Sequence, residues 1–123
     1  MKVLLVDDHA LFAKSLSIAL CDFPEIEQFS STKDIQHLEE LIAGELPDIL
    51  LIDINLGGLT DEDGLMLTKH LLEHFPEQKI VILSGYNLPV YRKEAKRVGA
   101  KGFISKDVEP DELLHILLMV NDG

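Results

Sequence analysis

The chain has 123 residues, 46% of them hydrophobic, which is an ordinary size for a single domain that buries its own core. Its formal charge of −11, from 22 acidic and 11 basic residues, argues against direct binding to nucleic acid, whose affinity depends on neutralising phosphates. The one cysteine, Cys21, cannot form an intrachain disulfide. The amino end does not resemble a signal peptide, and no segment approaches the roughly 20 apolar residues of a membrane span. We therefore expect a cytoplasmic domain.

Strand-like and helix-like segments alternate along the chain, which is typical of βα units around a parallel sheet. Three of the strand-like segments are continuous apolar runs, as expected of strands covered on both faces. With right-handed crossovers, the pattern predicts an α/β fold, a (βα)5 flavodoxin-like doubly wound parallel five-stranded sheet in the order 2-1-3-4-5. The predicted strands are Lys2–Val6, Ile26–Ser30, Ile49–Ile52, Ile80–Leu83 and Phe103–Ser105, and the predicted helices are His9–Asp22, Lys33–Ala43, Gly64–Phe75, Leu88–Val98 and Glu109–Asn121.

Residues with reactive side chains follow four of these strands. Asp7 and Asp8 follow the first strand, Asp53 the third, Ser84 the fourth and Lys106 the fifth. Because the carboxyl ends of parallel strands lie along one edge, these side chains should share one pocket. Three neighbouring carboxylates repel one another unless a divalent cation lies between them, and Mg²⁺ is the candidate because it binds oxygen ligands. A carboxylate beside Mg²⁺, with a hydroxyl and a lysine to hold incoming oxygens, can become an aspartyl phosphate.

Simpler explanations exist for each of these residues. Aspartates before helices are common N-caps, Ser84 could cap a turn, and Lys106 could be an ordinary solvated side chain. An acid pair after one buried strand, matched by a third acid after another, is harder to explain as capping, so we favour the functional interpretation. His9, next to the acid pair, is expected to be a surface residue at the rim because Mg²⁺ prefers oxygen.

The same residues resemble the receiver domain of two-component response regulators, and the resemblance covers essentially the whole chain. It is carried by the spacing of Asp7-Asp8, the lone Asp53, Ser84-Gly85 and the run Phe103–Lys106. The loop Asn55–Asp63 departs from the family pattern, since it is longer than usual and has Gly57 where a proline is common. The segments most similar to the NarL/FixJ branch are Val6–Phe12 and Gly99–Asp107.

The resemblance implies that Asp53 takes a phosphoryl group from a sensor histidine kinase or a small phosphodonor. Asp8 and Asp53 would hold Mg²⁺ directly, Asp7 directly or through water, and the backbone carbonyl of Asn55 would complete the protein's share. Such a domain is a phosphoacceptor that catalyses only its own phosphotransfer and autodephosphorylation, so it is not expected to be an enzyme with a separate substrate.

The resemblance also implies a switch. Lys106 would pair with the phosphoryl oxygens, and Ser84 would donate a hydrogen bond to one of them. Phe103 stands at the family's aromatic switch position, and inward rotation of its ring would accompany the movement of Ser84. The change would be read out on the surface of the fourth helix, fifth strand and fifth helix.

Residues 1–123 are expected to form the receiver domain. NarL/FixJ members usually continue into a helix-turn-helix DNA-binding domain, which we expect to be absent from this chain and to make any contact with DNA. Between Leu113 and Val120 seven of eight residues are hydrophobic, more than one buried stripe requires. We therefore expect a homodimer on phosphorylation, with Leu114 and Leu118 in the interface; burial in the core or packing on an effector domain would also account for these residues.

Other functions remain as alternatives. The domain could be a stand-alone receiver that acts through protein–protein interaction. A metal-dependent aspartyl-phosphate hydrolase would have a second acid two residues after the nucleophile, where this chain has Asn55. A flavodoxin-like cofactor carrier would have a phosphate-binding loop after the first strand, where Asp7 and Asp8 would repel phosphate.

Overall fold

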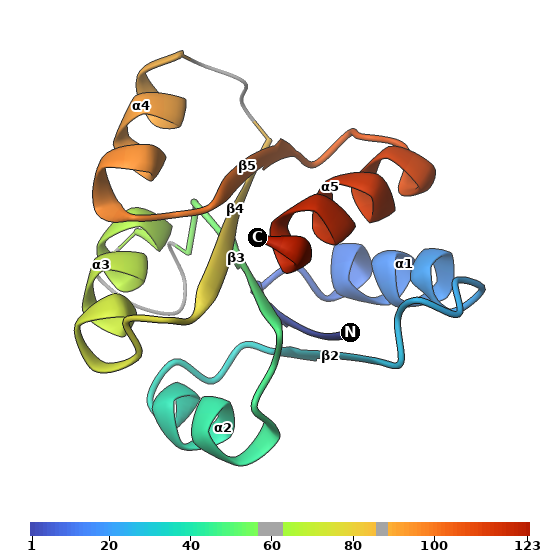
Figure 1. Cartoon of the computed structure of the whole chain (residues 1–123), viewed down its shortest axis with the longest axis horizontal. Helices are drawn as coiled ribbons and strands as arrows, with labels where there is room; N and C mark the ends of the chain where they lie inside the picture. The colour runs from blue at the N-terminus through green and yellow to red at the C-terminus, as the bar shows by residue number, and fades with distance from the viewer. Residues whose placement is uncertain (57–62, 86–88) are drawn as a thin grey trace.

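The computed structural model of the protein describes residues 1–56, 63–85 and 89–123. The described strands form one parallel sheet in the order β2-β1-β3-β4-β5, so the predicted fold is confirmed. Helices α1 and α5 cover one face of the sheet, and α2, α3 and α4 cover the other (Figure 1). The strands are β1 Lys2–Val6, β2 Gln28–Thr32, β3 Ile49–Asp53, β4 Lys79–Ser84 and β5 Gly102–Ser105, and the helices are α1 Ala10–Leu20, α2 Leu38–Glu45, α3 Gly64–His74, α4 Pro89–Val98 and α5 Pro110–Asp122.

The central strands are buried on both faces, as their apolar sequences predict. Along β1, Leu4 and Val6 point into the core under α2 to α4, while Val3 and Leu5 point into the core under α1 and α5. The same alternation along β3 and β4 gives each face its own hydrophobic cluster. Burial of each side chain of this size contributes about 1.5–3 kcal/mol to the stability of the fold. The two cores therefore hold the strands, and the residues at their ends, in fixed positions.

The predicted start of β2 is wrong by two residues. Its first residue is Gln28, which is paired with Lys2, rather than Ile26. Ile26 instead donates its backbone N–H to the carbonyl of Phe23 at 3.1 Å in a turn. The strand then continues to Thr32, beyond the predicted end at Ser30.

The predicted start of α2 at Lys33 is also wrong, because side chains in this segment compete with helical hydrogen bonds. The hydroxyl of Thr32 accepts a hydrogen bond from the N–H of Asp34 at 3.0 Å, and the carboxylate of Asp34 accepts one from the N–H of His37 at 3.2 Å. These contacts favour turns, and the helix begins only at Leu38.

Helix α2 ends two residues after its predicted end at Ala43. The helix continues to Glu45, and Leu46 adopts the left-handed conformation with a φ of 50°. Its N–H donates to the carbonyl of Ile42 at 2.9 Å, which closes the last turn. A residue other than glycine thus takes the position that glycine usually fills.

The other elements begin and end within two residues of their predicted bounds. Most of the loop expected between Asn55 and Asp63, including Gly57, lies outside the described residues, as does the predicted first residue of the fourth helix, Leu88. No helix in the described part of the chain is both long enough and apolar enough to cross a membrane.

Candidate functional site

The carboxyl ends of the strands bring the predicted residues together at one edge of the sheet. The backbone ladder continues just past the strand ends: the N–H of Asp7 donates to the carbonyl of Thr32 at 3.2 Å, and the N–H of Lys106 donates to the carbonyl of Ser84 at 2.8 Å. Asp53 is the last residue of β3, between these two positions. The sheet's hydrogen bonds, rather than flexible loops, therefore fix the backbone of each of these residues.

Lys106 joins two carboxylates that are distant in sequence. Its Nζ lies 3.0 Å from Oδ2 of Asp7 and 3.0 Å from Oδ2 of Asp53. The ammonium group also lies 4.6 Å from the centre of the Phe12 ring, at a distance suited to a cation–π contact. The lysine side chain is only 18% exposed, so this is a mostly buried ion pair rather than a solvated surface one.

Asp53 is the more deeply placed acid of the pair, with 1% of the residue exposed. Its Oδ1 accepts a hydrogen bond from the backbone N–H of Asn55 at 3.2 Å. Burial raises the pKa of the Asp53 carboxyl, and the charge of Asp7 adds to this effect, while Lys106 and the N–H of Asn55 offset only part of it. Asp53 therefore ionises less readily in the metal-free protein than an ordinary aspartate does.

The pKa of Asp7 is shifted in the opposite direction. Burial acts to raise its pKa, but hydrogen bonds from the backbone N–H of His9 and from Lys106 outweigh burial, so the pKa lies below the ordinary aspartate value. The N–H of His9 donates to Oδ1 of Asp7 at 2.9 Å, which is a strong, charge-assisted contact. Asp7 therefore ionises more readily than an ordinary aspartate.

Asp8 completes the acid cluster. Its Oδ1 is buried, and it has no hydrogen-bond partner among the described residues. Such an oxygen is costly unless a cation or another donor approaches it. One ligand atom from each of Asp7, Asp8, His9 and Asp53 can be chosen so that all lie within 4.8 Å of one another. The donor set therefore fits a divalent cation, and carboxylate oxygens are what Mg²⁺ binds.

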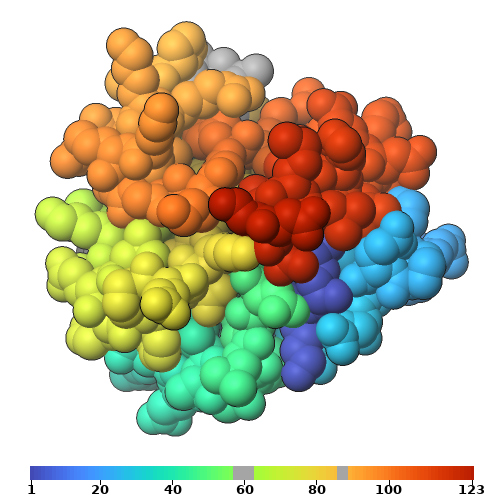
Figure 2. All heavy atoms as spheres, viewed as in Figure 1, coloured from blue at the N-terminus to red at the C-terminus, as the bar shows by residue number. Residues whose placement is uncertain are grey.

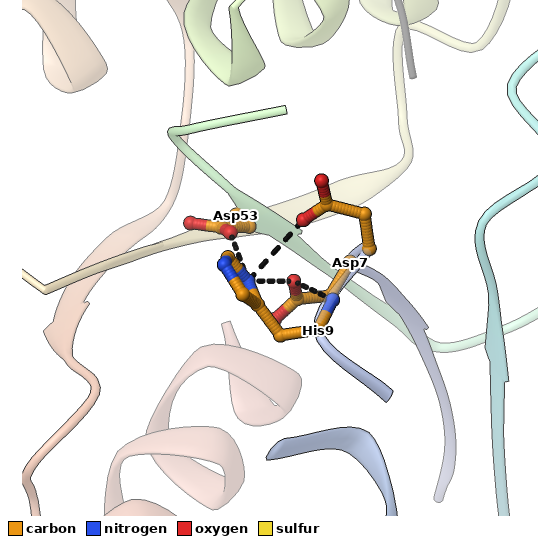
Figure 3. Close-up of side chains that lie close together, drawn as sticks. Asp7, His9 and Asp53 are labelled. Atoms are coloured by element: carbon orange, nitrogen blue, oxygen red, sulfur yellow. Dashed lines mark hydrogen bonds and ion pairs between the residues drawn. The ribbon is translucent and has the colours of Figure 1, made fainter. Parts of the chain in front are cut away.

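His9 was predicted to be a surface residue at the rim, and it also contacts the acid cluster. Its side chain is 52% exposed, as a rim position implies, but Nδ1 reaches into the acid cluster. Figure 3 shows the ring between the carboxylates of Asp7 and Asp53. Its position directly after the acid pair is the sequence signal for this contact.

The two predicted switch residues lie on neighbouring strands. Ser84 is fully buried at the end of β4, and its register partner on β5 is Ser105. Phe103 is half-buried and packs against the core under α2 to α4. The guanidinium carbon of Arg92 lies 5.1 Å from the centre of the Phe103 ring, so the ring lies beneath α4.

The start of α3 is packed directly against the backbone of Asp53. A Cβ atom on Gly64 would lie 2.2 Å from the carbonyl oxygen of Asp53, a distance that no side chain can adopt. The N–H of Gly64 donates to the carbonyl of Ile54 at 2.9 Å, and Asp63 caps the helix by accepting from the N–H of Met66 at 2.9 Å. Glycine at this position therefore allows the helix to support the end of β3.

Comparison with known proteins gives the same assignment as the geometry. The family model of the response regulator receiver domain matches residues 3–118. The oxygen regulatory protein NreC of Staphylococcus haemolyticus is 32% identical over 123 residues, covering 100% of this chain and 56% of that protein. The transcriptional regulatory protein DegU of Brevibacillus brevis is 28% identical over the whole chain and 51% of its own length. The chain thus spans about half the length of these relatives.

Solved structures show the same fold. The signal receiver domain of a putative response regulator NarL from Mycobacterium tuberculosis has a TM-score of 0.82 and 25% identity, covering 99% of this chain and 96% of that one. A LuxR-family two-component response regulator from Aurantimonas has a TM-score of 0.87 at 22% identity, covering 99% of this chain and 85% of that one.

The opposite pKa shifts of Asp53 and Asp7 predict opposite effects of neutralising them in metal-free protein. Because the pKa of Asp53 is raised, its ionisation costs the fold free energy that builds up as pH rises from the ordinary aspartate pKa to the raised one, so Asp53→Asn should increase the free energy of unfolding at neutral pH, on the order of 1 kcal/mol. This gain should vanish below the ordinary aspartate pKa. The charge of Asp7 stabilises the fold above its ordinary pKa, so Asp7→Asn should lower the free energy of unfolding at neutral pH by a similar amount.

Urea denaturation in the presence of a chelator, over a pH series, measures both effects. The difference between Asp7→Asn and wild type should disappear as pH falls through the lowered pKa of Asp7. Shifts of the same sign for the two variants would contradict this description of the site.

Proposed function

The chain belongs to the response regulator receiver domain family, with relatives of the NarL and LuxR type, and on this premise we propose that it is a phosphorylation-activated switch whose phosphoacceptor is Asp53. The observation that carries the proposal is the contact of Lys106 with Asp53 and Asp7 at 3.0 Å each. These contacts support a site in which the buried carboxylate of Asp53 faces the ammonium group of Lys106 and the neighbouring acid pair.

A carboxylate oxygen of Asp53 attacks the phosphorus of a phosphohistidine on a sensor histidine kinase, or of a small phosphodonor. A P–O bond to Asp53 forms while the bond from phosphorus to the donor's nitrogen or oxygen breaks, and the leaving group keeps that electron pair. Lys106 remains next to the transferred group and neutralises part of its charge. Hydrolysis of the acyl phosphate by water would return Asp53 to its free form, so the domain acts on itself and not on a separate substrate.

Asp7, Asp8 and Asp53, with the backbone carbonyl of Asn55, are the groups that would hold Mg²⁺. When bound, Mg²⁺ would offset the charge of the carboxylates and of the phosphoryl oxygens. The buried Oδ1 of Asp8 supports this assignment, because it makes no hydrogen bond among the described residues, although Nδ1 of His9 lies 3.2 Å away, and a cation would compensate its charge. Asn55 stands where a hydrolase would have its second acid, which favours the phosphoacceptor over the hydrolase function.

Phosphorylation of Asp53 adds about −1.5 to −2 charges at pH 7. Ser84 would donate a hydrogen bond to a phosphoryl oxygen, and the Phe103 ring would rotate inward as Ser84 moves. Since the Phe103 ring lies against Arg92 of α4, such a rotation would change the surface of α4 and β5. Phosphorylation would thus shift a two-state equilibrium that is read out on that surface.

The effect of the switch on transcription is inferred from the longer relatives, which are about twice the length of this chain. Residues 1–123 would be the receiver half of a transcription regulator, and DNA would be bound by a carboxyl-terminal helix-turn-helix domain outside this chain. The charge of −11 supports this division, because the receiver itself would be repelled by the DNA backbone. A receiver that acts alone through protein–protein contacts is the second candidate.

If Asp53 is the sole phosphoacceptor, incubation with acetyl phosphate and Mg²⁺ should modify wild type but not Asp53→Asn. The matched control is Asp111→Asn, at an exposed position of α5, which changes the net charge equally and should be modified like wild type. Mass spectrometry of the intact protein detects the added phosphoryl group. Equal modification of Asp53→Asn and wild type would exclude Asp53 as the acceptor.

We further propose that phosphorylation strengthens self-association through α5. Figure 2 shows α5 (red) beside α1 (blue), and the two helices are in contact. On α5, Leu113 and Leu117 are used in the core, while Met119 is 62% exposed and Leu118 is half-buried. Leu114, also expected in the interface, is 8% exposed and offers little surface. Leu118 is therefore the better position at which to disrupt a dimer.

Sedimentation with and without beryllofluoride and Mg²⁺ tests this proposal. Wild type should associate more strongly in the activated state, with a coupling of about 1–3 kcal/mol. Leu118→Glu should stay monomeric, while Met66→Glu, at a partly exposed apolar position on α3, should behave like wild type. A wild-type monomer in both states would show that the apolar residues of α5 serve the core or another domain.

A further inference from the structure

The Nδ1 atom of His9 has more close polar neighbours than its protons can satisfy. It lies 2.7 Å from Oδ1 of Asp7, 3.2 Å from Oδ1 of Asp8 and 3.3 Å from Oδ2 of Asp53. Nζ of Lys106, which can only donate, lies 3.2 Å away. One ring nitrogen can donate one hydrogen bond or accept one, so no tautomer satisfies three carboxylate oxygens and an ammonium group together.

We propose that His9 is a nitrogen ligand of the cation site, and that it makes this site favour borderline transition-metal ions such as Co²⁺ and Zn²⁺ more than three carboxylates alone would. The inference rests on the proposed cation site at Asp7, Asp8 and Asp53. It adds a fourth side chain to that site and changes the class of ion that the site selects.

The spacing of the donor atoms supports this role. Zinc-type ions bind nitrogen and oxygen at about 2.0–2.2 Å, so neighbouring ligand atoms around one ion lie about 3 Å apart. The distances from Nδ1 to the three carboxylate oxygens, 2.7 to 3.3 Å, are of this size. Figure 3 shows the ring nitrogen facing both Asp7 and Asp53. No large movement of the ring is needed to complete the ligand set.

The burial of the carboxylates also supports His9 as a ligand of the cation. Asp7 and Asp53 are almost fully buried, and the buried Oδ1 of Asp8 has no hydrogen-bond partner in the described part of the chain. A cation bound by Nδ1 and these oxygens would give the three carboxylate oxygens and Nδ1 one common partner, while the ammonium group of Lys106, 3.2 Å from Nδ1, would have to move away from the ring. The exposed half of the His9 ring leaves the site open on one side, as exchange of ions with solvent requires.

The chemical consequence is a change in selectivity. Three carboxylates form a hard, all-oxygen set of the kind that Mg²⁺ binds, whereas imidazole nitrogen suits zinc, nickel and similar ions. A histidine in the set therefore adds affinity for Co²⁺ and Zn²⁺ but little for Mg²⁺. Transition-metal ions could then occupy the site at concentrations far below those at which Mg²⁺ does.

Calorimetric titration of wild type and His9→Ala with Co²⁺ and with Mg²⁺ tests the proposal. Co²⁺ affinity should fall about tenfold or more in His9→Ala, because a direct ligand is worth at least as much as the outer contacts that typically cost 10- to 100-fold. The loss for Mg²⁺ should be much smaller. The matched control is His115→Ala, at an exposed position of α5, which should bind Co²⁺ like wild type.

A spectroscopic readout identifies the ligand atom itself. In ¹⁵N-labelled wild type, Zn²⁺ should shift the Nδ1 resonance of His9 and leave that of His115 unchanged. Equal Co²⁺ affinity in wild type and His9→Ala would overturn the proposal. Tighter binding of both ions by His9→Ala would also overturn it, because the ring would then only occupy the cation's place. Phosphorylation of wild type in Mg²⁺ alone tests the proposed function separately, since it does not depend on nitrogen ligation.

Discussion

The contact of one ammonium group with two buried carboxylates organises the functional edge of this protein. Nζ of Lys106 holds Asp7 at the end of β1 and Asp53 at the end of β3, although the lysine itself follows β5 at one side of the sheet. The hydrophobic cores on the two faces fix these strand ends, so the charges cannot move apart to relieve their repulsion. Apolar packing elsewhere thus keeps like charges close together at one edge of the sheet, so that a cation or a phosphoryl group would meet a site that is already assembled.

The two acids that share Lys106 are not equivalent, and the difference follows from their backbone partners. Asp7 receives hydrogen bonds from the backbone of His9 and from Lys106, and these keep its pKa low despite burial. Burial dominates at Asp53 and raises its pKa. Asp7 therefore ionises the more readily of the two, while ionised Asp53 gains more from a positive neighbour. This division of roles suits a site in which one carboxylate is permanent and the other is chemically modified.

The sequence was sufficient to predict the sheet order and the convergence of Asp7, Asp53 and Lys106, because continuous apolar strands must be buried on both faces and parallel strands end at one edge. It failed where side chains compete locally with helical hydrogen bonds, as Thr32 and Asp34 do before α2, since such contacts depend on geometry that composition does not reveal. It placed His9 at the rim but did not predict the contact of Nδ1 with the acid cluster, because that contact depends on the direction of one side chain at the start of α1.

The central claim is that the acid cluster requires a cation, and the Mg²⁺ dependence of thermal stability tests it most directly for wild type and Asp8→Ala. The melting temperature of wild type should rise with Mg²⁺, corresponding to about 2.7 kcal/mol at about 100 times the dissociation constant. That of Asp8→Ala should barely change with Mg²⁺, and without Mg²⁺ the variant should be the more stable protein because one like charge has been removed. A variant that gains as much stability from Mg²⁺ as wild type does would contradict the account.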